Sequence, residues 1–242
     1  MNKEKKLFSI REAAEFLRVS IDTLRRWDSK GKFKAIKSSG GHRYYSQEQL
    51  KMFGLDLASE AFLWIESEIA PELKSSQYCY TQDIFRARLD TMASEIEQSL
   101  TDKKLVPLIV AITGEIGNNS FDHNFGNWPN VPGVFFSYNT YKKEIVLADR
   151  GLGIKETLLR VRPDLKDDLM ALKIAFTEHI SARAPEQRGN GLKFVNNVAT
   201  KNQIGLLLYS GLAVADIAKK KGFLRISKSS KEIKGTLTKI IY

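Results

Sequence analysis

Small and apolar residues recur at helical spacing in the middle of the chain, over residues 109–124. One side of the predicted helix carries Ile109, Ile112, Ile116 and Ser120, which are expected to pack against a core. Glu115 and Asn119 are four residues apart, so they project together from another face, and Asp122 follows one turn later. The pattern therefore predicts a helix with one buried face and one row of oxygen-bearing side chains.

This polar row suits a divalent cation and a water molecule. The amide oxygen of Asn119 is a hard ligand of the kind that Mg²⁺ takes, and the Glu115 carboxylate is able to accept a proton from water. A solvated polar face on an amphipathic helix is the alternative interpretation. Gly117 counts slightly against a purely structural helix, because an interior glycine costs about 1 kcal/mol relative to alanine.

Three later stretches carry further candidate residues for ligand binding. The strand-like run 145–154 places Asp149 at its end, where a carboxylate can accept a hydrogen bond from an exocyclic amine. Gly151 and Gly153 follow and allow the backbone to approach a ring closely. Two more glycines open a helical pattern at 188–195, which leaves backbone N–H groups for phosphates. The last stretch is the alternating segment 234–241.

In this order and at these separations, the four stretches resemble the nucleotide-binding domain of the GHKL superfamily. Glu115-Ile-Gly-Asn-Asn-Ser-Phe-Asp122 is similar to its N box, and Asp149-Arg-Gly-Leu-Gly to its D-x-G-x-G box. Gly189-Asn-Gly-Leu192 is similar to its G-x-G box, and Gly235-Thr236 to its terminal G-T. The superfamily includes gyrase B, the MutL repair proteins and the histidine kinases. The resemblance covers about residues 80–242.

The resemblance implies a C-terminal Bergerat-type α/β sandwich that binds ATP and Mg²⁺. Asn119 would then hold Mg²⁺, Asp149 would fix adenine with support from Thr236, and Glu115 would be the general base of the hydrolysing members. The remaining ATP-binding residues implied by the motifs are Gly151, Gly153, Gly189, Gly191 and Leu192. Residues 155–188 correspond to the lid over the triphosphate, where Arg183 and Arg188 either pair with phosphates or face solvent.

The N-terminal segment predicts two short helices joined by a tight turn. Ser9 and Glu12 form a capping box for the first helix, with its apolar stripe at Ala13, Phe16 and Leu17. Ser20 caps the second helix, residues 21–30, which is expected to bury Leu24 and Trp27 and to end at Gly31. The pair is a helix-turn-helix pattern.

A β-hairpin is predicted next, over residues 32–45 with its turn at Gly40-Gly41, and a Ser46–Gln49 capping box opens another helix. Thr23-Leu-Arg-Arg-Trp27 and Gly40-Gly-His-Arg-Tyr44 resemble the winged helix-turn-helix of MerR-type regulators and excisionase-like domains. The resemblance implies double-stranded DNA as a partner, and the alternative is a fold reused for protein contacts. Candidate DNA-binding residues are Thr23, Arg25, Arg26, Lys37, His42 and Arg43.

The charge distribution favours a polyanion partner for this N-terminal segment. Residues 1–51 hold 13 of the 38 Lys and Arg residues and 6 of the 28 acidic ones, a net charge of +7, whereas the remainder nets +3. The chain has no long apolar run or apolar leader, and Cys79 is its single cysteine. We therefore expect a cytoplasmic protein without a membrane partner, disulfide or cysteine metal cluster.

Residues 54–106 separate the two resemblances and are interpreted as a helical connector. One amphipathic helix precedes Pro71, and a second begins after a Thr81 cap. The apolar stripe of the second helix belongs either to the intramolecular core or to a dimer seam, so a homodimer stays open. The fold class is α+β, with a winged helix-turn-helix over 1–53, this connector, and the sandwich over 107–242.

The last part of the chain is predicted to supply the sheet. A hairpin is expected over 133–149 with its turn near Asn139-Thr140. A helix over 193–199 and four further strands follow, at 204–210, 212–217, 223–227 and 236–241.

Two functions remain open from the sequence. One is a transcriptional regulator or a mobile-element or defence component, in which a slowly hydrolysing nucleotide switch controls the DNA reader. The other is a kinase of the histidine-kinase or anti-sigma type acting on a partner protein, because none of His42, His123 and His179 lies where an internal phosphoacceptor belongs.

Overall fold

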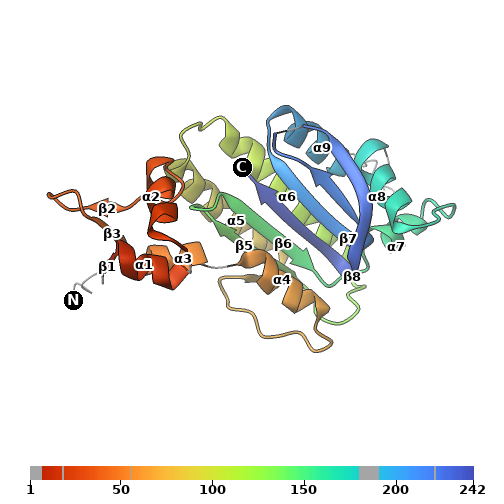
Figure 1. Ribbon diagram of the computed structural model, residues 1–242. Helices are drawn as coiled ribbons and strands as arrows, with labels where there is room; N and C mark the ends of the chain where they lie inside the picture. The colour runs from red at the N-terminus through yellow and green to blue at the C-terminus, as the bar shows by residue number, and fades with distance from the viewer. Residues whose placement is uncertain (1–6, 18, 55, 180–190, 221) are drawn as a thin grey trace. The chain divides into compact units, whose positions relative to one another are not determined.

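The computed structural model describes residues 7–17, 19–54, 56–179, 191–220 and 222–242 (Figure 1). The chain divides into two compact units. The first comprises residues 1–56 with the segment 139–143, and the second comprises 57–138 and 144–242. Each unit has its own hydrophobic core.

The first unit combines three helices with a small three-stranded sheet in the order β1-β3-β2. Its elements are β1 (Leu7–Ser9), α1 (Ile10–Leu17), α2 (Ile21–Ser29), β2 (Ile36–Lys37), β3 (Arg43–Ser46) and α3 (Gln47–Gly54). The hairpin is antiparallel with Ile36 opposite Tyr44 and Lys37 opposite Arg43, and Gly41 adopts a positive φ of 77° at its turn. The helix-turn-helix and the wing are confirmed, whereas β1 was not expected.

Both predicted capping boxes are present in the first unit. The backbone N–H of Ser9 donates to Oε2 of Glu12 at 2.7 Å, and Glu12 N–H donates back to Ser9 Oγ at 3.4 Å. Ser46 and Gln49 repeat the exchange at 2.9 and 3.1 Å. These reciprocal bonds satisfy orphan N–H groups and fix where α1 and α3 begin.

The expected core of the first unit needs two corrections. Ala13 and Leu24 are buried as predicted, and Phe33 and Tyr45 stack at the centre of the same cluster with ring centroids 4.8 Å apart. Phe16, however, is 47% exposed, and Trp27 is only partly buried. The small Ala13 and Ala14 form the buried face of α1 instead, because they allow the helices to approach closely.

The second unit is an antiparallel sheet with helices on both faces. The strand order is β4-β5-β6-β8-β7. Its helices are α4 (Leu57–Glu66), α5 (Gln82–Ser99), α6 (Leu105–Asn124), α7 (Ile154–Leu159), α8 (Asp168–Thr177) and α9 (Gly191–Lys201). Its strands are β4 (Tyr78–Cys79), β5 (Val134–Asn139), β6 (Glu144–Asp149), β7 (Gly205–Ile217) and β8 (Leu224–Ile241).

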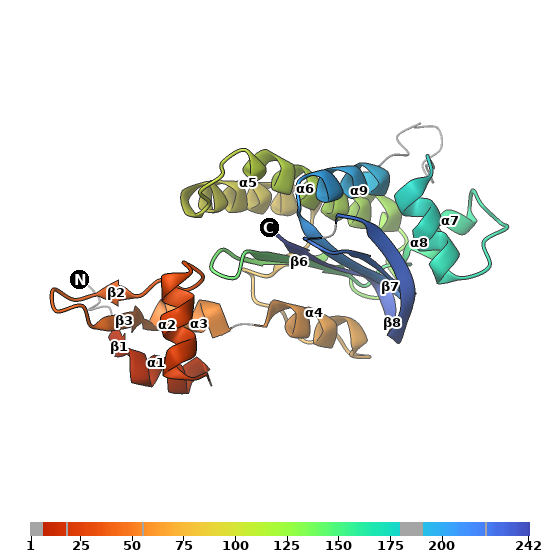
Figure 2. The same ribbon diagram turned by 45° about the horizontal axis from the view of Figure 1, so that its top comes forward.

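The helices form a layer on each side of this sheet (Figure 2). Helices α5, α6 and α9 lie on one face, and α4 packs on β6 and β8 from the other. Every residue of β6 is buried, as expected for a central strand covered on both faces. The strand therefore carries Asp149 into the interior.

The predicted connector over 54–106 is not a separate part of the chain. Helices α4 and α5 belong to the second unit. The apolar stripe of α5, with Phe85, Met92 and Ile96, lies in the main core, so the intramolecular interpretation is the correct one for these residues. The glycine at position 117 is explained by packing, because a Cβ there would lie 2.1 Å from Cζ of Phe85. The glycine allows α5 and α6 to pack closely.

The four strands predicted after residue 203 are two long ones. Strands β7 and β8 pair antiparallel along their lengths, with register shifts around Gly211. Gly211 has a positive φ of 56°, and the irregularity accommodates the residue that we expected to break the strand. The helix predicted at 193–199 is confirmed as the longer α9.

Candidate functional site

The carboxylate of Asp149 is buried at the end of β6, where hydroxyl and backbone N–H groups donate to it. The hydroxyls of Ser120 and Thr236 donate to Oδ2 at 2.8 and 2.6 Å, and the backbone N–H of Gly151 donates to Oδ1 at 2.9 Å. Asp149 is 1% exposed, and burial raises its pKa although the hydrogen bonds oppose that shift. The site thus holds a carboxylate whose described donors are all uncharged.

The loop after Asp149 is tied to helix α6 by Asn124. The side chain of Asn124 accepts from the Leu152 N–H at 2.8 Å and donates to the carbonyl of Ser120 at 2.8 Å. A Cβ on Gly151 would lie 2.1 Å from Asn124 Nδ2. Gly151 is therefore required for the close approach of the loop to α6.

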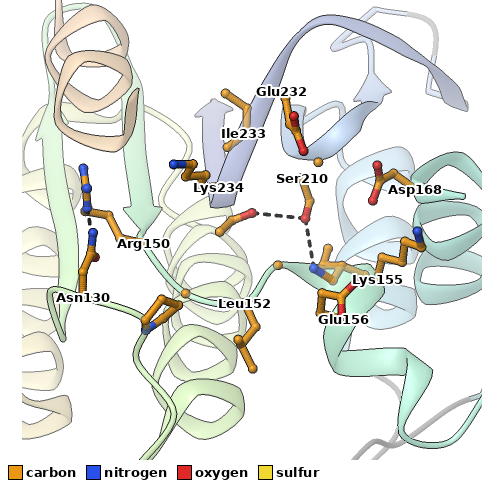
Figure 3. Close-up of a pocket in the computed structure, with 16 residues that line it drawn as sticks. Asn130, Arg150, Leu152, Lys155, Glu156, Asp168, Ser210, Glu232, Ile233 and Lys234 are labelled. Atoms are coloured by element: carbon orange, nitrogen blue, oxygen red, sulfur yellow. Dashed lines mark hydrogen bonds between the residues drawn. The ribbon is translucent and has the colours of Figure 1, made fainter. Parts of the chain in front are cut away.

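Strands β7 and β8 hold the other side of the same loop. Ser210 Oγ donates to the Gly235 carbonyl at 3.1 Å and accepts from the Ile154 N–H at 2.9 Å (Figure 3). Gly153 has a positive φ of 80°, and a Cβ on Gly235 would lie 2.2 Å from the carbonyl oxygen of Asp149. These glycines allow three backbone segments to meet around one carboxylate.

A second group of predicted residues meets where α9 begins. A Cβ on Gly191 would lie 2.1 Å from Oε1 of Glu115 and 3.1 Å from Nδ2 of Asn119, so the start of α9 contacts both side chains. Leu192 is partly buried against the main core. The first N–H groups of a helix lack intrahelical partners and attract anions, so oxygen-bearing side chains and a helix N-terminus converge here.

Helix α6 joins the two groups. It carries Glu115 and Asn119 toward the start of α9, and Ser120 and Asn124 toward the Asp149 loop. The structure therefore brings together seven predicted residues: Glu115, Asn119, Asp149, Gly151, Gly153, Gly191 and Thr236. Predicted Gly189, Arg183 and Arg188 lie outside the described residues.

The side chains near Gly191 do not by themselves form a metal cluster. Over the described parts of the chain, no group of three or more His, Cys, Asp or Glu side chains is arranged to hold a metal ion. Glu115 and Asn119 offer a carboxylate and an amide oxygen on one helix face, which Mg²⁺ accepts when phosphates and water complete its shell. The residues fit a nucleotide-borne magnesium ion better than a free one.

The sequence placed Ser120 on the packing face and did not indicate its hydrogen bond to Asp149, and it gave no role to three further residues of this region. Asn124 and Ser210 fasten the Asp149 loop from two sides, and Arg150 follows Asp149 directly. Arg150 is the second residue of the Asp149-Arg-Gly-Leu-Gly motif, and the motif itself gives this position no role. Its position next to a buried strand end was the one available indication.

Arg150 is 4% exposed and binds the end of helix α4. Its guanidinium donates to the carbonyls of Trp64, of Ile65 at 3.1 Å and of Glu68 at 3.3 Å, and to Oδ1 of Asn130 at 3.2 Å. Burial lowers the pKa of Arg150, but an arginine stays protonated. The cation thus satisfies C-terminal helix carbonyls.

A cavity of about 340 Å³ lies beside the loop (Figure 3). Residues 150–156 line it together with 232–235, Asp168 and Ser210, and its charged side chains have both signs. The cavity therefore borders the loop after Asp149 through residues such as Gly151, Gly153 and Gly235. It does not include the carboxylates of Asp149 and Glu115 or the amide of Asn119.

The candidate DNA-binding residues of helix α2 lie on its outer side. Arg25 and Arg26 are exposed, and Thr23 is partly buried where its N–H binds the N-cap Ser20 Oγ at 3.1 Å. Arg25 pairs with Asp22 at 3.1 Å, but both side chains are well exposed, so water screens this pair. Both arginines are available to a polyanion.

The wing residues differ from one another. His42 is exposed, whereas Nε of Arg43 donates to Oδ2 of Asp28 at 2.6 Å and Lys37 lies 3.6 Å from the same oxygen. Burial raises the pKa of Asp28, but the Ala35 N–H, Arg43 and Lys37 outweigh it and hold that pKa below its usual value. Arg43 and Lys37 therefore tie the wing to the end of α2, a role that the sequence did not indicate.

None of the described helices has the length and apolar character needed to span a membrane.

Comparison with known proteins identifies relatives of parts of the chain. A type II methyltransferase from Escherichia coli, M.Eco47II, is 38% identical over 82 residues. This similarity covers 34% of the present chain and 18% of the methyltransferase, so the chain spans less than a fifth of that relative's length. Residues 9–45 match the MerR family regulatory protein domain. The N-terminal helix-turn-helix with its wing is therefore a MerR-like domain.

Proposed function

We propose that the protein is a DNA-binding regulator in which ATP, bound by the second unit, controls a MerR-like reader. The observation that carries the nucleotide half is the meeting of two groups on α6: the buried Asp149 carboxylate, and Glu115 with Asn119 at the start of α9. The match of residues 9–45 supports the DNA half.

The Asp149 region suits an adenine ring. A buried carboxylate with only uncharged donors is costly, and an exocyclic amine would supply one more donor to it. Thr236 and Ser120 fix the carboxylate by their hydroxyls, and Gly153 and Gly235 allow the backbone of the loop and of β8 to close around it. The donor set therefore fits an adenine base.

The start of α9 suits the phosphates. Its N–H groups favour negative charge. Gly191 allows the side chains of Glu115 and Asn119 to come close to the start of the helix, where a Cβ would collide with Glu115. Asn119 would hold Mg²⁺ through its amide oxygen, and the ion, when bound, supplies positive charge to the phosphate oxygens. Glu115 would orient a water and hold its proton as a general base.

The DNA half rests on the exposed arginines of α2 and on the charge of the segment. Residues 1–51 net +7, and Arg25 and Arg26 face outward from the second helix of a helix-turn-helix. In that geometry the second helix reads base edges in the major groove. Because the chain spans so little of the methyltransferase, methyl transfer forms no part of the proposed function.

The proposal is tested by two substitutions on one face of α6. Glu115→Ala is expected to keep ATP–Mg²⁺ affinity within a few-fold and to abolish turnover, because the base is removed and the ligands stay. Asn119→Ala is expected to weaken binding by about tenfold or more in the presence of Mg²⁺, and much less in its absence. Binding is measured by calorimetry and turnover by phosphate release.

The outcomes separate hydrolysis from other roles. If Glu115→Ala hydrolyses ATP at the wild-type rate, Glu115 is not the general base. If wild-type protein binds no ATP in millimolar Mg²⁺, the nucleotide switch is wrong and only the DNA reader remains. Glu97→Ala, at an exposed position of α5 that the proposal does not use, is the control and is expected to change neither quantity.

A further inference from the structure

Asp149 and Arg150 are neighbours in the chain, but their side chains bind different layers of the second unit. Asp149 accepts from Ser120 on α6, on one face of the sheet. Arg150 donates to backbone carbonyls at the end of α4, on the other face. This follows from extended backbone, in which consecutive side chains point to opposite sides. Two adjacent residues therefore connect the loop to both helix layers, Asp149 to α6 and Arg150 to the end of α4.

The contact between Arg150 and α4 is buried in the protein interior. Arg150 is 4% exposed, and its four described acceptors are uncharged oxygens, three of them from residues 64–68. The guanidinium also lies 5.9 Å from the ring of Trp64. A planar fork that binds several carbonyls at once fixes the position of α4 relative to the loop. A shift of one therefore moves the other.

Helix α4 is also the first element after the MerR-like domain in the chain. The first unit includes Asp56, and α4 begins at Leu57. A helix of ten residues is stiff along its length, so its C-terminal end and its N-terminal end move together. A displacement at the carbonyls of Trp64 and Ile65 would therefore reach Leu57, which follows Asp56 of the first unit in the chain.

We propose that Arg150 is a positioning residue that transmits nucleotide binding at the Asp149 loop to helix α4, and through α4 to the MerR-like domain. The proposal rests on the proposed function, since it names how that function is regulated. Arg150 itself touches no nucleotide in this scheme. It acts through α4, and its loss uncouples the two units without removing either binding site.

Hydrogen exchange of the full-length protein, with and without Mg²⁺ and a non-hydrolysable ATP analogue, tests this directly. In wild type the analogue is expected to slow exchange by about threefold or more, both in residues 149–154 and at the end of α4, residues 62–68. In Arg150→Lys the loop is still protected, but the response of 62–68 is lost. A lysine ammonium keeps the positive charge, but it lacks the planar guanidinium that donates to several carbonyls at once.

Lys231→Ala is the matched control. Lys231 is another cation that contacts α4, through Glu66 at 3.0 Å, but it lies outside the loop, and both segments are expected to respond as in wild type. Arg150→Ala is measured in parallel, with thermal unfolding as the check that it folds. A retained response of 62–68 in either Arg150 variant overturns the proposal, as does a wild-type protein whose loop responds and whose α4 does not. If the wild type binds no analogue, the proposed function itself fails.

Discussion

At the residue scale, the burial of the Asp149 carboxylate lowers the stability of the fold. Burial raises the pKa of this carboxyl group, and the hydrogen bonds from Ser120, Thr236 and Gly151 oppose that shift without cancelling it. A carboxylate that is harder to ionise in the folded protein than in the unfolded chain weakens the fold at neutral pH. Such a residue is expected where function requires the charge.

Asp149→Asn is therefore expected to stabilise the protein near neutral pH while it weakens ATP binding by about 10–100-fold, the effect of a lost charged hydrogen bond. The amide oxygen can still accept from Gly151, and the amide N–H groups can donate to the hydroxyls of Ser120 and Thr236. Thermal unfolding and calorimetric titration measure the two effects on the same sample.

Comparing the stability of the wild-type and Asp149→Asn proteins at several pH values tests whether folding raises the pKa of Asp149. Because the pKa of Asp149 is raised on folding, its contribution is fully present below the unfolded pKa, about 4, and is lost as pH rises through the folded value. The stability advantage of Asp149→Asn should thus be small at acid pH and grow as pH rises. An advantage that is equal at pH 4 and pH 8 would exclude this explanation.

The sequence predicted such residues well only when their partners were close along the chain. Ser9–Glu12 and Ser46–Gln49 are three residues apart and were found from spacing alone. Asp149 was selected by its motif, and the structure shows it buried at the end of β6 as a hydrogen-bond acceptor. Ser210 binds Ile154 across 56 residues and Arg150 binds Ile65 across 85, and no local pattern encodes such pairs. These contacts depend on how the layers stack.

At the element scale, the wing and the recognition helix are joined by one buried carboxylate. Asp28, near the end of α2, accepts from Arg43 on β3, from the Ala35 N–H before β2, and faces Lys37. The sequence interpretation gave Arg43 and Lys37 to DNA phosphates. In the structure much of their charge is offset by Asp28, so Arg43 is expected to set the position of the wing.

We expect Asp28→Asn and Arg43→Ala each to lower the free energy of unfolding by about 1–3 kcal/mol, because each removes the charged hydrogen bond between Asp28 and Arg43. The double variant should cost less than the sum of the two. The low pKa of Asp28 means that this stabilisation is present above about pH 4 and is lost as pH falls through the lower folded value. Urea unfolding at two pH values measures both effects.

Arg25→Ala, on the same helix as Asp28, is the variant with which Asp28→Asn and Arg43→Ala are compared. Its pair with Asp22 is exposed, so stability should change by no more than about 0.5 kcal/mol. DNA binding should weaken, with about one ion lost from its salt dependence if Arg25 contacts a phosphate, or about 1–3 kcal/mol of sequence preference if it reads a base. An Arg43→Ala protein of unchanged stability that loses a full ion from its salt dependence would instead make Arg43 a phosphate contact.

Elements were predicted best where one face alone is buried. Helices α5, α6 and α9 have clear stripes and were found near their observed positions. The connector was misjudged because amphipathic pattern does not say against which surface a helix packs, and α4 and α5 cover the sheet. Strands β7 and β8 were each divided in two, since Gly211 and the polar run before Gly235 look like breaks and are irregularities within pairing.

At the scale of the whole molecule, the charge excess and the candidate nucleotide residues lie in different units. The segment 1–51 nets +7, whereas Glu115, Asn119 and Asp149 all belong to the second unit. Combining them in one chain is useful to a regulator only if each binding event alters the other. The coupling free energy is then the quantity that distinguishes a switch from two tethered domains.

The last prediction follows from the reciprocity of linked binding. If ATP changes the affinity for DNA by some factor, DNA must change the affinity for ATP by the same factor, typically about 5–150-fold for couplings of about 1–3 kcal/mol. The Glu115→Ala protein is the suitable material, because turnover does not disturb its equilibria. Its ATP dissociation constant is measured with and without a DNA site selected from a random pool, and its DNA affinity with and without ATP. Two equal, non-unit factors are expected, and their loss in Arg150→Lys would place the coupling at α4. Factors of one in the Glu115→Ala protein would mean that ATP serves another partner and that the DNA reader is only tethered to it.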